Sequence, residues 1–418
     1  MKRRVVVTGM GAVTPIGIGL NNFWQASLEG VSGVGEITLF DAHDYETHIA
    51  AEVKNFNPQD FMLPEVYRKT DRFAQMGVAA AGMAIDDAGI KSLIDRNRNT
   101  IPVIIGSAVG GSLFHEEQIF RLIDNRNPRK VLSSSVPRIA PNAVSAYIAM
   151  QFKLRGPNMT ISTACSSGSN AIATAAQILR SGIANIAITG GAECPITPFT
   201  YAAYQSLRVL SKNSNGKGTP RPFDQDRDGF VLGEGAGILV LEDFDSALAR
   251  GARIYAELCG FASNCGAYHM AAPDPSGEDA AQAIKSALVD AGVNKREVNY
   301  INAHGTATKM NDICETVAIG NIFGFGEKGP YVSSTKSEIG HTIGAAGAIE
   351  AILTCLTIKH DVIPATINCD HVDAMCNINI VRHQALKTKV NYAISNSFGF
   401  GSNNSVLVFK KVDNFYHK

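Results

Sequence analysis

The stretch that decides the fold is Met159-Thr160-Ile161-Ser162, followed directly by Thr163-Ala164-Cys165-Ser166-Ser167-Gly168. The first four residues favour a β-strand, and residues 170–176 are rich in alanine and typical of a helix. Cys165 is therefore predicted to lie where a strand passes into a helix. There the unpaired N–H groups and the positive end of the helix dipole favour a thiolate, which is a nucleophile. Because most single cysteines only pack in a core, other motifs must support this interpretation.

Two further segments have the same form, a short strand that ends in a polar turn containing glycine. Residues 298–303 lead into His304-Gly305-Thr306-Ala307-Thr308, and residues 333–341 read Ser-Ser-Thr-Lys-Ser-Glu-Ile-Gly-His. Catalytic side chains of layered α/β proteins are usually found on such turns, and an adjacent glycine lets the backbone approach a ligand. We therefore predict four catalytic residues: Cys165, His304, Lys336 and His341.

The rest of the chain alternates buried strands with helices. Near-continuous apolar runs at residues 186–191, 237–241, 392–395 and 406–409 are typical of buried strands, and residues 73–88, 279–291 and 345–358 have the length and composition of helices. A strand that ends in a reactive residue recurs in both parts of the chain. The sequence thus predicts a large α/β protein with two related halves.

Several motifs occur in an order that is informative as a set. They are Arg3-Arg4-Val5-Val6-Val7-Thr8-Gly9, Leu154-Arg155-Gly156-Pro157, the Cys165 motif, Arg221-Pro222-Phe223-Asp224, Arg227-Asp228-Gly229-Phe230, the two histidine motifs and Asn396-Ser397-Phe398-Gly399-Phe400-Gly401. In these motifs the chain resembles the β-ketoacyl-acyl-carrier-protein synthases of the elongating type, within the thiolase-like superfamily. The resemblance implies an α/β thiolase-like fold, two fused related halves in a layered αβαβα arrangement. An N-terminal half, residues 1–251, would carry the nucleophilic cysteine, and a C-terminal half, residues 252–418, would carry the two histidines and the lysine.

The resemblance also implies an activity. Cys165 would accept an acyl chain from the phosphopantetheine thioester of an acyl carrier protein, and malonyl-carrier protein would then lose carbon dioxide and extend that chain by two carbons in fatty acid biosynthesis. This is the reaction of an acyltransferase that works through a covalent intermediate. His304 and His341 would donate hydrogen bonds to the enolate oxygen. Lys336 would maintain the electrostatics of the site with Glu315 as its carboxylate partner, because a buried lysine without an anion tends to lose its proton.

Other residues of these motifs are expected to support the site. The backbone N–H of Phe400, with that of Cys165, would stabilise the tetrahedral intermediate, and the glycines beside Phe400 would let its loop swing as a gate. Supporting roles are also expected for Thr306, Thr308 and Phe398, and an acyl pocket is expected at Val109 and Tyr204. The chain departs from the usual family pattern at Ala307, Ser402 and Tyr204, which bears on the substrate. His269 is expected to be structural.

Alternatives remain open at this point. A ketosynthase (alpha) subunit of a type II polyketide or polyene synthase would carry the same catalytic residues, and the presence of Cys165 argues against its inactive chain-length partner. A Cys-His thioester hydrolase is less favoured, because two histidine motifs and a lysine exceed what a hydrolytic dyad requires. Gly9-Met10-Gly11 imitates a dinucleotide-binding motif, but its third glycine is missing and Pro15 follows closely.

Composition limits the partners. Lys and Arg number 38 and Asp and Glu number 38, so the chain has no overall attraction to nucleic acid or to an anionic membrane. Local docking of an acidic carrier protein is expected at exposed basic residues, namely Arg68, Lys69, Arg129, Lys130 and Arg208. A homodimer with residues 158–163 at the interface is expected, or a heterodimer with a chain-length partner in the polyketide case.

The cysteines and the apolar runs point to a location. Eight cysteines without zinc spacing, and no signal peptide at the N-terminus, predict a cytoplasmic protein without a metal. No bound cofactor is expected, since the substrates are carried on phosphopantetheine. No apolar run is expected to reach the length that spans a membrane.

Overall fold

The two halves of the chain repeat one strand topology. In the computed structural model, which describes residues 2–213 and 218–412, the strands of the first half are β1 (Val5–Thr14), β5 (Val103–Gly106), β6 (Asn158–Ile161), β7 (Ile186–Glu193) and β8 (Gly235–Asp243). Those of the second half are β9 (Ala256–Cys265), β10 (Tyr300–Asn302), β11 (Tyr331–Ser333), β14 (Tyr392–Gly399) and β15 (Asn403–Lys410). In each half the first strand pairs antiparallel with the fifth, the fifth antiparallel with the fourth, the fourth parallel with the second, and the second parallel with the third. The prediction of two related halves is confirmed.

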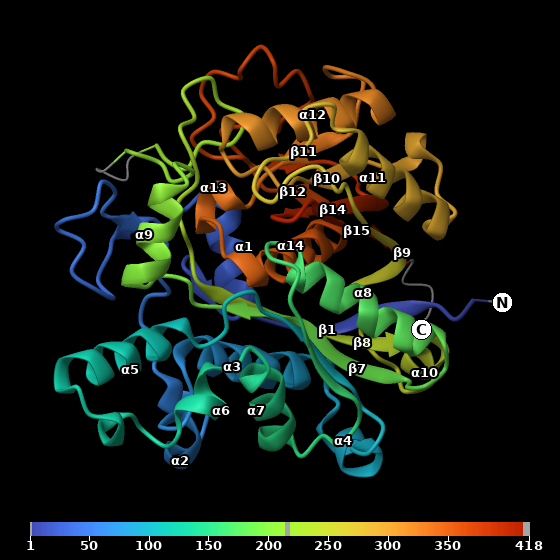
Figure 1. Cartoon of the computed structure of the whole chain (residues 1–418). Helices are drawn as coiled ribbons and strands as arrows, with labels where there is room; N and C mark the ends of the chain where they lie inside the picture. Colours follow the sequence, from blue (N-terminus) through green and yellow to red (C-terminus); the bar gives the residue numbers. More distant parts are fainter. Residues whose placement is uncertain (1, 214–217, 413–418) are drawn as a thin grey trace.

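The halves meet through their first strands. β1 and β9 pair antiparallel at only two positions, Val6 with Glu257 and Val7 with Ala256, which joins the strands of both halves into one sheet. Between the two halves of this sheet lie α8 (Ser167–Arg180) and α14 (Ala346–His360), as Figure 1 shows. Residues 346–358 of α14 are all buried. This central helix pair is the middle layer of the molecule.

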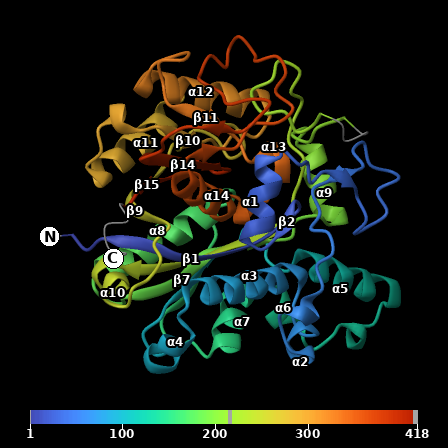
Figure 2. The same cartoon turned by 180° about the vertical axis from the view of Figure 1, so that it is seen from behind.

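Outer helices complete the layers. On the first half, α3 (Arg72–Ala88) and α7 (Ala143–Phe152) pack on the outer face, and on the second half α11 (Glu278–Ala291) and α12 (Lys309–Phe323) do so (Figures 1 and 2). The layered αβαβα fold is thereby confirmed. The remaining elements are α1 (Leu20–Leu28), α2 (Pro64–Tyr67), α4 (Lys91–Asn97), α5 (Ser112–Asn125), α6 (Ser135–Ile139), α9 (Pro198–Ser206), α10 (Phe244–Ala249), α13 (Lys336–Ile339), β2 (Gly17–Ile18), β3 (Gly35–Glu36), β4 (Ile49–Ala50), β12 (Val362–Ile363) and β13 (Leu386–Lys387), with short 3₁₀ turns η1 (Pro58–Asp60), η2 (Pro128–Lys130), η3 (Lys295–Glu297) and η4 (Ile343–Ala345).

The glycines that imitate a nucleotide motif have a packing role instead. Gly9 and Gly11 lie inside β1, against α3. A Cβ at Gly9 would come 2.4 Å from the carbonyl oxygen of Ala84, and one at Gly11 would come 2.1 Å from that of Ala80. Because no side chain fits there, these glycines let α3 lie directly on the strand.

One expectation about apolar runs is wrong. The helical stretch Ile343–His360 has 18 residues and a mean hydropathy of 1.2, so by length and composition it could cross a membrane. However, 89% of the stretch is buried inside the protein, because it forms the central α14 between the two halves. A core helix that is covered on all sides has no polar face, so it matches a membrane helix in composition.

We predict that the middle layer tolerates no extra methyl group at Gly168. A Cβ there would lie 2.9 Å from the backbone nitrogen of Ala348 in the neighbouring central helix. Gly168→Ala should therefore lower the stability by about 1–3 kcal/mol. Gly82→Ala is the matched control in α3, where a Cβ would meet only the tip of Phe152 at 3.5 Å, and it should add about 0.4–1 kcal/mol. Melting temperatures of both variants measure the difference, and an unchanged melting temperature for Gly168→Ala would contradict it.

Candidate active site

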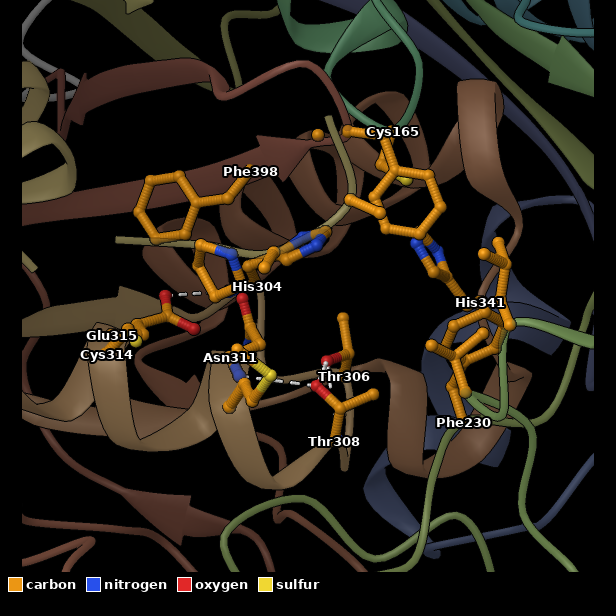
Figure 3. Close-up of a pocket in the computed structure, with 18 of the residues that line it drawn as sticks. Cys165, Phe230, His304, Thr306, Thr308, Asn311, Cys314, Glu315, His341 and Phe398 are labelled. Carbon is orange, nitrogen blue, oxygen red and sulfur yellow. Dashed lines mark hydrogen bonds between the residues drawn. The ribbon is translucent and has the colours of Figure 1, made fainter. Parts of the chain in front are cut away.

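Three of the four predicted catalytic residues, from both halves, converge on one cavity of about 390 Å³. Cys165 lies between β6 and α8, His304 follows β10, and His341 follows α13. All three side chains line the cavity, with Phe398 and Glu315 beside His304 (Figure 3). Segments far apart in the sequence are brought together because each follows a strand or short helix at the same edge of the layered core.

A sharp turn presents Cys165. Ala164 has a left-handed backbone angle, with φ of 50°, and the N–H of Ser166 donates to the carbonyl of Thr163 at 3.2 Å. Ser166 is the N-cap of α8, so the cysteine directly precedes the helix, as predicted. Non-glycine residues with positive φ are uncommon in proteins as a whole, and those that occur are concentrated at functional sites.

Burial nevertheless disfavours the thiolate of Cys165. Its side chain is buried, and this burial raises the pKa of Cys165 to about 11. The nearby charge of Lys336 and the backbone N–H groups of Phe400 and Cys165 lower that pKa but do not offset the burial. The helix terminus was expected to favour the thiolate, but the loss of solvent opposes this effect and has the larger influence on the pKa of Cys165.

Both histidines are fixed as neutral donors. Nδ1 of His304 lies 3.1 Å from Nζ of Lys336, and Nδ1 of His341 lies 3.3 Å from the backbone nitrogen of Ile343. An ammonium group and a backbone N–H can only donate, so each Nδ1 accepts and each proton is on Nε2. Burial and then the charge of Lys336 hold the pKa of both imidazoles well below the usual range. The ring centroids are 5.4 Å apart.

Lys336 is paired with a residue that the sequence did not indicate. Its Nζ lies 2.5 Å from Oε1 of Glu350, in the middle of α14, and also donates to the carbonyl of His304 at 2.6 Å. The expected pairing with Glu315 is wrong. Both partners of the observed pair are almost fully buried, so the lysine lies behind the cavity. A single acidic residue in the mostly apolar stretch 346–358 was the available signal for Glu350.

Glu315 supports the histidine loop instead. Its carboxylate accepts from the backbone N–H groups of His304 and Gly305 at 2.9 and 2.8 Å, and from Nδ2 of Asn396 at 3.0 Å. Burial raises the pKa of Glu315 to about 7. It therefore fixes the position of the His304 backbone.

Of the other residues expected to support the site, all but one line the cavity. Thr306 and Thr308 line the cavity with their hydroxyl oxygens 2.9 Å apart, and the ring of Phe398 lies 5.8 Å from that of His304. Tyr204 lines it between Phe230 and Phe400, and burial raises the pKa of its hydroxyl. Val109, expected in an acyl pocket, is not a lining residue of this cavity.

The Phe400 loop is tied to a second loop. Ser402 has φ of 54°, and its hydroxyl accepts from the backbone N–H groups of Tyr268 and His269 at 3.3 Å and donates to the carbonyl of His269 at 3.1 Å. The N–H of Gly401 donates to the carbonyl of Met270 at 2.7 Å. His269 itself lines the cavity, a placement that the sequence analysis missed.

The basic residues expected at a docking surface are all exposed, and none forms an ion pair in the described part of the chain. Of these, Arg208 lines the cavity, whereas Arg68, Lys69, Arg129 and Lys130 lie outside its lining, on and beside α2 and η2. Residues 2–213 and 218–412 contain no group of three histidine, cysteine or acidic side chains placed to hold a metal ion.

Comparison with known proteins gives consistent matches over the whole chain. A family model described as the N-terminal domain of beta-ketoacyl synthase matches residues 2–247, and the model of the C-terminal domain matches residues 255–370. The chain is 44% identical over 411 residues to 3-oxoacyl-[acyl-carrier-protein] synthase 2 of Synechocystis sp., covering 98% of each protein. It is 43% identical over 411 residues to the protein of the same name from Staphylococcus aureus strain N315, covering 98% of this chain and 99% of the relative.

Solved structures with the same fold include ketosynthases of polyketide pathways. The ishigamide ketosynthase/chain length factor matches with a TM-score of 0.93 and 36% identity, covering 99% of this chain and 100% of the other. A type II polyketide ketosynthase in complex with its acyl-carrier protein matches with a TM-score of 0.90 and 32% identity, over the same shares of the two chains.

We predict that alkylation of Cys165 by iodoacetamide depends steeply on pH. With a thiol pKa of about 11, the rate should rise about tenfold per pH unit from pH 7 to 10, because only the thiolate reacts. The control is Cys265, an exposed free thiol in the same chain, which should be modified first at pH 7.5. Peptide mass mapping at timed intervals measures both rates. A plateau of the Cys165 rate below pH 9 would show that the thiolate forms more readily than the burial implies.

Proposed function

The chain belongs to the beta-ketoacyl synthase family of acyltransferases, and from that premise we propose that it extends an acyl chain held on Cys165 by two carbons taken from malonyl-acyl carrier protein. The carrier protein is a substrate of this chain by inference from the names of its relatives. The observation that supports the proposal best is the pair of neutral Nε2–H donors beside a cysteine in one cavity.

In the first half-reaction the sulfur of Cys165 attacks the thioester carbonyl of the acyl-carrier protein. The carbon–sulfur bond to phosphopantetheine breaks, and the thiol proton of Cys165 goes to the departing pantetheine sulfur. The backbone N–H groups of Cys165 and Phe400 lie near the sulfur of Cys165. They are therefore suited to stabilise the oxyanion of the tetrahedral intermediate that forms on that sulfur. The product is an acyl-enzyme, so the kinetics are ping-pong.

In the second half-reaction malonyl-carrier protein loses carbon dioxide. Negative charge then builds on its thioester oxygen, and the Nε2–H groups of His304 and His341 donate to that oxygen. The resulting carbanion attacks the acyl-enzyme, the bond to Cys165 breaks, and the sulfur takes up a proton from solvent. Lys336 acts through His304 by occupying Nδ1. We propose that the hydroxyl groups of Thr306 and Thr308, which line the cavity, hydrogen-bond the amides of the pantetheine arm.

A type II polyketide or polyene ketosynthase is the second candidate. It is favoured by Tyr204, a cavity-lining residue that adds a hydroxyl to the wall-forming side chains, because a polar group matches a keto-bearing chain better than a plain hydrocarbon one. It is also favoured by two solved structures, a type II polyketide ketosynthase with 32% identity and a ketosynthase/chain length factor with 36% identity. A thioester hydrolase is the third and weakest candidate, because the two donors aimed at one oxygen serve decarboxylation rather than hydrolysis.

Several finer points belong to the same proposal. Arg68, Lys69, Arg129, Lys130 and Arg208 would dock the acidic carrier protein, and a 1–251 and 252–418 division would place the boundary between α10 and β9. β6 is an edge strand with exposed Asn158 and Met159, and such an edge is suited to pair with a second chain. We propose a homodimer there, or a heterodimer in the polyketide case. The protein would act in the cytoplasm without a bound cofactor.

Substitution separates the two half-reactions. Cys165→Gln should abolish condensation and acyl-enzyme formation while malonyl decarboxylation continues, because the histidines remain. His304→Ala or His341→Ala should lower decarboxylation by about a hundredfold and acylation much less, since one enolate donor is lost. Release of labelled carbon dioxide and intact-mass spectrometry report the two steps. Cys265→Ser is the control thiol, and a Cys165→Gln protein that still condenses at the parent rate would overturn the mechanism.

Intact-mass spectrometry also distinguishes the two pathways. The parent is incubated with saturated and polyenoyl carrier proteins of different lengths and then with malonyl-carrier protein. Adducts on Cys165 from a range of saturated chains, each extended by two carbons, are the result expected for fatty acid synthesis. Labelling by polyenoyl or ketoacyl chains alone, or only with a partner subunit present, would replace that assignment by the polyketide one.

A further inference from the structure

A strained turn follows His341. Ile343 has a left-handed backbone angle, with φ of 46°, although its side chain is β-branched. Such residues rarely adopt this conformation, and they keep it only where the surrounding structure holds them. The same turn directs the N–H of Ile343 to Nδ1 of His341 at 3.3 Å. The hydrogen bond that fixes the tautomer of His341 therefore comes from a residue in an unfavourable conformation.

The next residue is held by a carboxylate. The N–H of Gly344 donates to Oε2 of Glu193 at 3.1 Å. A Cβ at Gly344 would lie 2.3 Å from that oxygen and 2.7 Å from the backbone nitrogen of Ala108. No side chain fits between them, so the carboxylate rests directly on the backbone of the turn. Glu193 is the last residue of β7, and its side chain is fully buried.

Glu193 also holds the loop of residues 107–109. Its Oε1 accepts from the hydroxyl of Ser107 at 2.9 Å and from the N–H of Val109 at 3.3 Å, and its Oε2 accepts from the N–H of Ala108 at 2.6 Å. With Gly344 this makes four donors on one carboxylate. No lysine or arginine forms an ion pair with it in residues 2–213 and 218–412. The side chain thus joins the 107–109 loop to the 343–344 turn.

The geometry excludes direct chemistry by this group. Glu193 is not among the residues that line the cavity, and both its oxygens are occupied by donors. Burial raises the pKa of Glu193 to about 7, and after burial the charge of Glu193 is a smaller cause of the raised pKa of Cys165 and of Tyr204. It lies close to the reaction and can act on it only through the residues it holds.

We propose that Glu193 is a positioning residue, whose carboxylate holds the strained Ile343–Gly344 turn so that His341 stays a neutral Nε2–H donor to the enolate. This inference rests on the proposed function of His341. It assigns the last residue of β7 a part in decarboxylation that is separate from the Lys336–Glu350 pair, which acts on His304.

The test is Glu193→Gln. The amide replaces one acceptor oxygen by a donor, and whichever oxygen is replaced, the new N–H faces two existing donors. The kcat of malonyl decarboxylation should fall by about ten- to a hundredfold, because a misoriented His341 stabilises the enolate only in part. The KM for malonyl-carrier protein and the rate of Cys165 acylation should change by less than about threefold, because neither depends on the tautomer of His341.

Glu52→Gln is the matched control. Glu52 is also buried, forms no ion pair in the described chain, and accepts from the backbone N–H groups of Thr38 and Leu39 and the hydroxyl of Thr38. It does not line the cavity. Its variant carries a comparable loss of buried hydrogen bonds but should decarboxylate like the parent. Equal decarboxylation by the two glutamine variants would overturn the proposal.

A rescue tests the turn itself. Glycine adopts a left-handed angle without strain, so Ile343→Gly in the Glu193→Gln background should restore decarboxylation at least about threefold. Ile343→Ala, which also removes side-chain volume but keeps the strain, should not. Equal rescue by glycine and alanine would overturn the argument from strain. If Glu193→Gln does not fold, Glu193→Asp, which withdraws the carboxylate but keeps its charge, must show the same selective loss.

A crystal structure of the Glu193→Gln variant tests the inference independently of any activity assay. We expect φ of Ile343 to leave the left-handed region and the distance from its nitrogen to Nδ1 of His341 to exceed 3.5 Å. An unchanged turn would overturn the role of Glu193. A parent protein without malonyl decarboxylation would instead overturn the proposed function, so the two failures are distinguishable.

Discussion

The active site depends on one buried cation. Nζ of Lys336 lies against Glu350, the carbonyl of His304 and Nδ1 of His304, all within the second half. Removing one partner of such a buried pair costs about 3–5 kcal/mol, because the other charge is left without compensation. The cation also disfavours protonation of both histidines and lowers the pKa of Cys165. After burial, which is the larger cause in each case, this one charge influences the pKa of three cavity side chains.

The repeated topology explains how these groups meet. Each half supplies turns at the same edge of its strands, so pairing the halves face to face around α8 and α14 brings those turns together (Figure 1). The first half places the nucleophile before α8, and the second half places the histidines and the lysine. The side chains of the site come from both halves, so both halves form the walls of the cavity. The strands of the two halves nevertheless pair directly at only two positions.

Local patterns predicted the main elements and three of the side chains that line one cavity. The apolar runs predicted β7, β8, β14 and β15, and the strand-end motifs predicted Cys165, His304 and His341. Contacts between distant segments were not predictable. Glu350 replaces Glu315 beside Lys336, and Glu193 joins two loops, because long-range packing decides which buried carboxylate faces which donor. The net effect on the thiol was also missed, since the helix terminus is a local feature whereas burial is a property of the whole fold.

The burial of Cys165 also bears on how readily its thiol is oxidised. Peroxides oxidise thiolates rather than thiols, and irreversible oxidation begins with the sulfenic acid. A nucleophile that is 6% exposed, with a pKa raised to about 11, presents almost no thiolate to solvent between turnovers. Cys265, which is free and exposed, is the more accessible target. The burial that raises the pKa of Cys165 is therefore expected to slow its oxidation relative to that of Cys265.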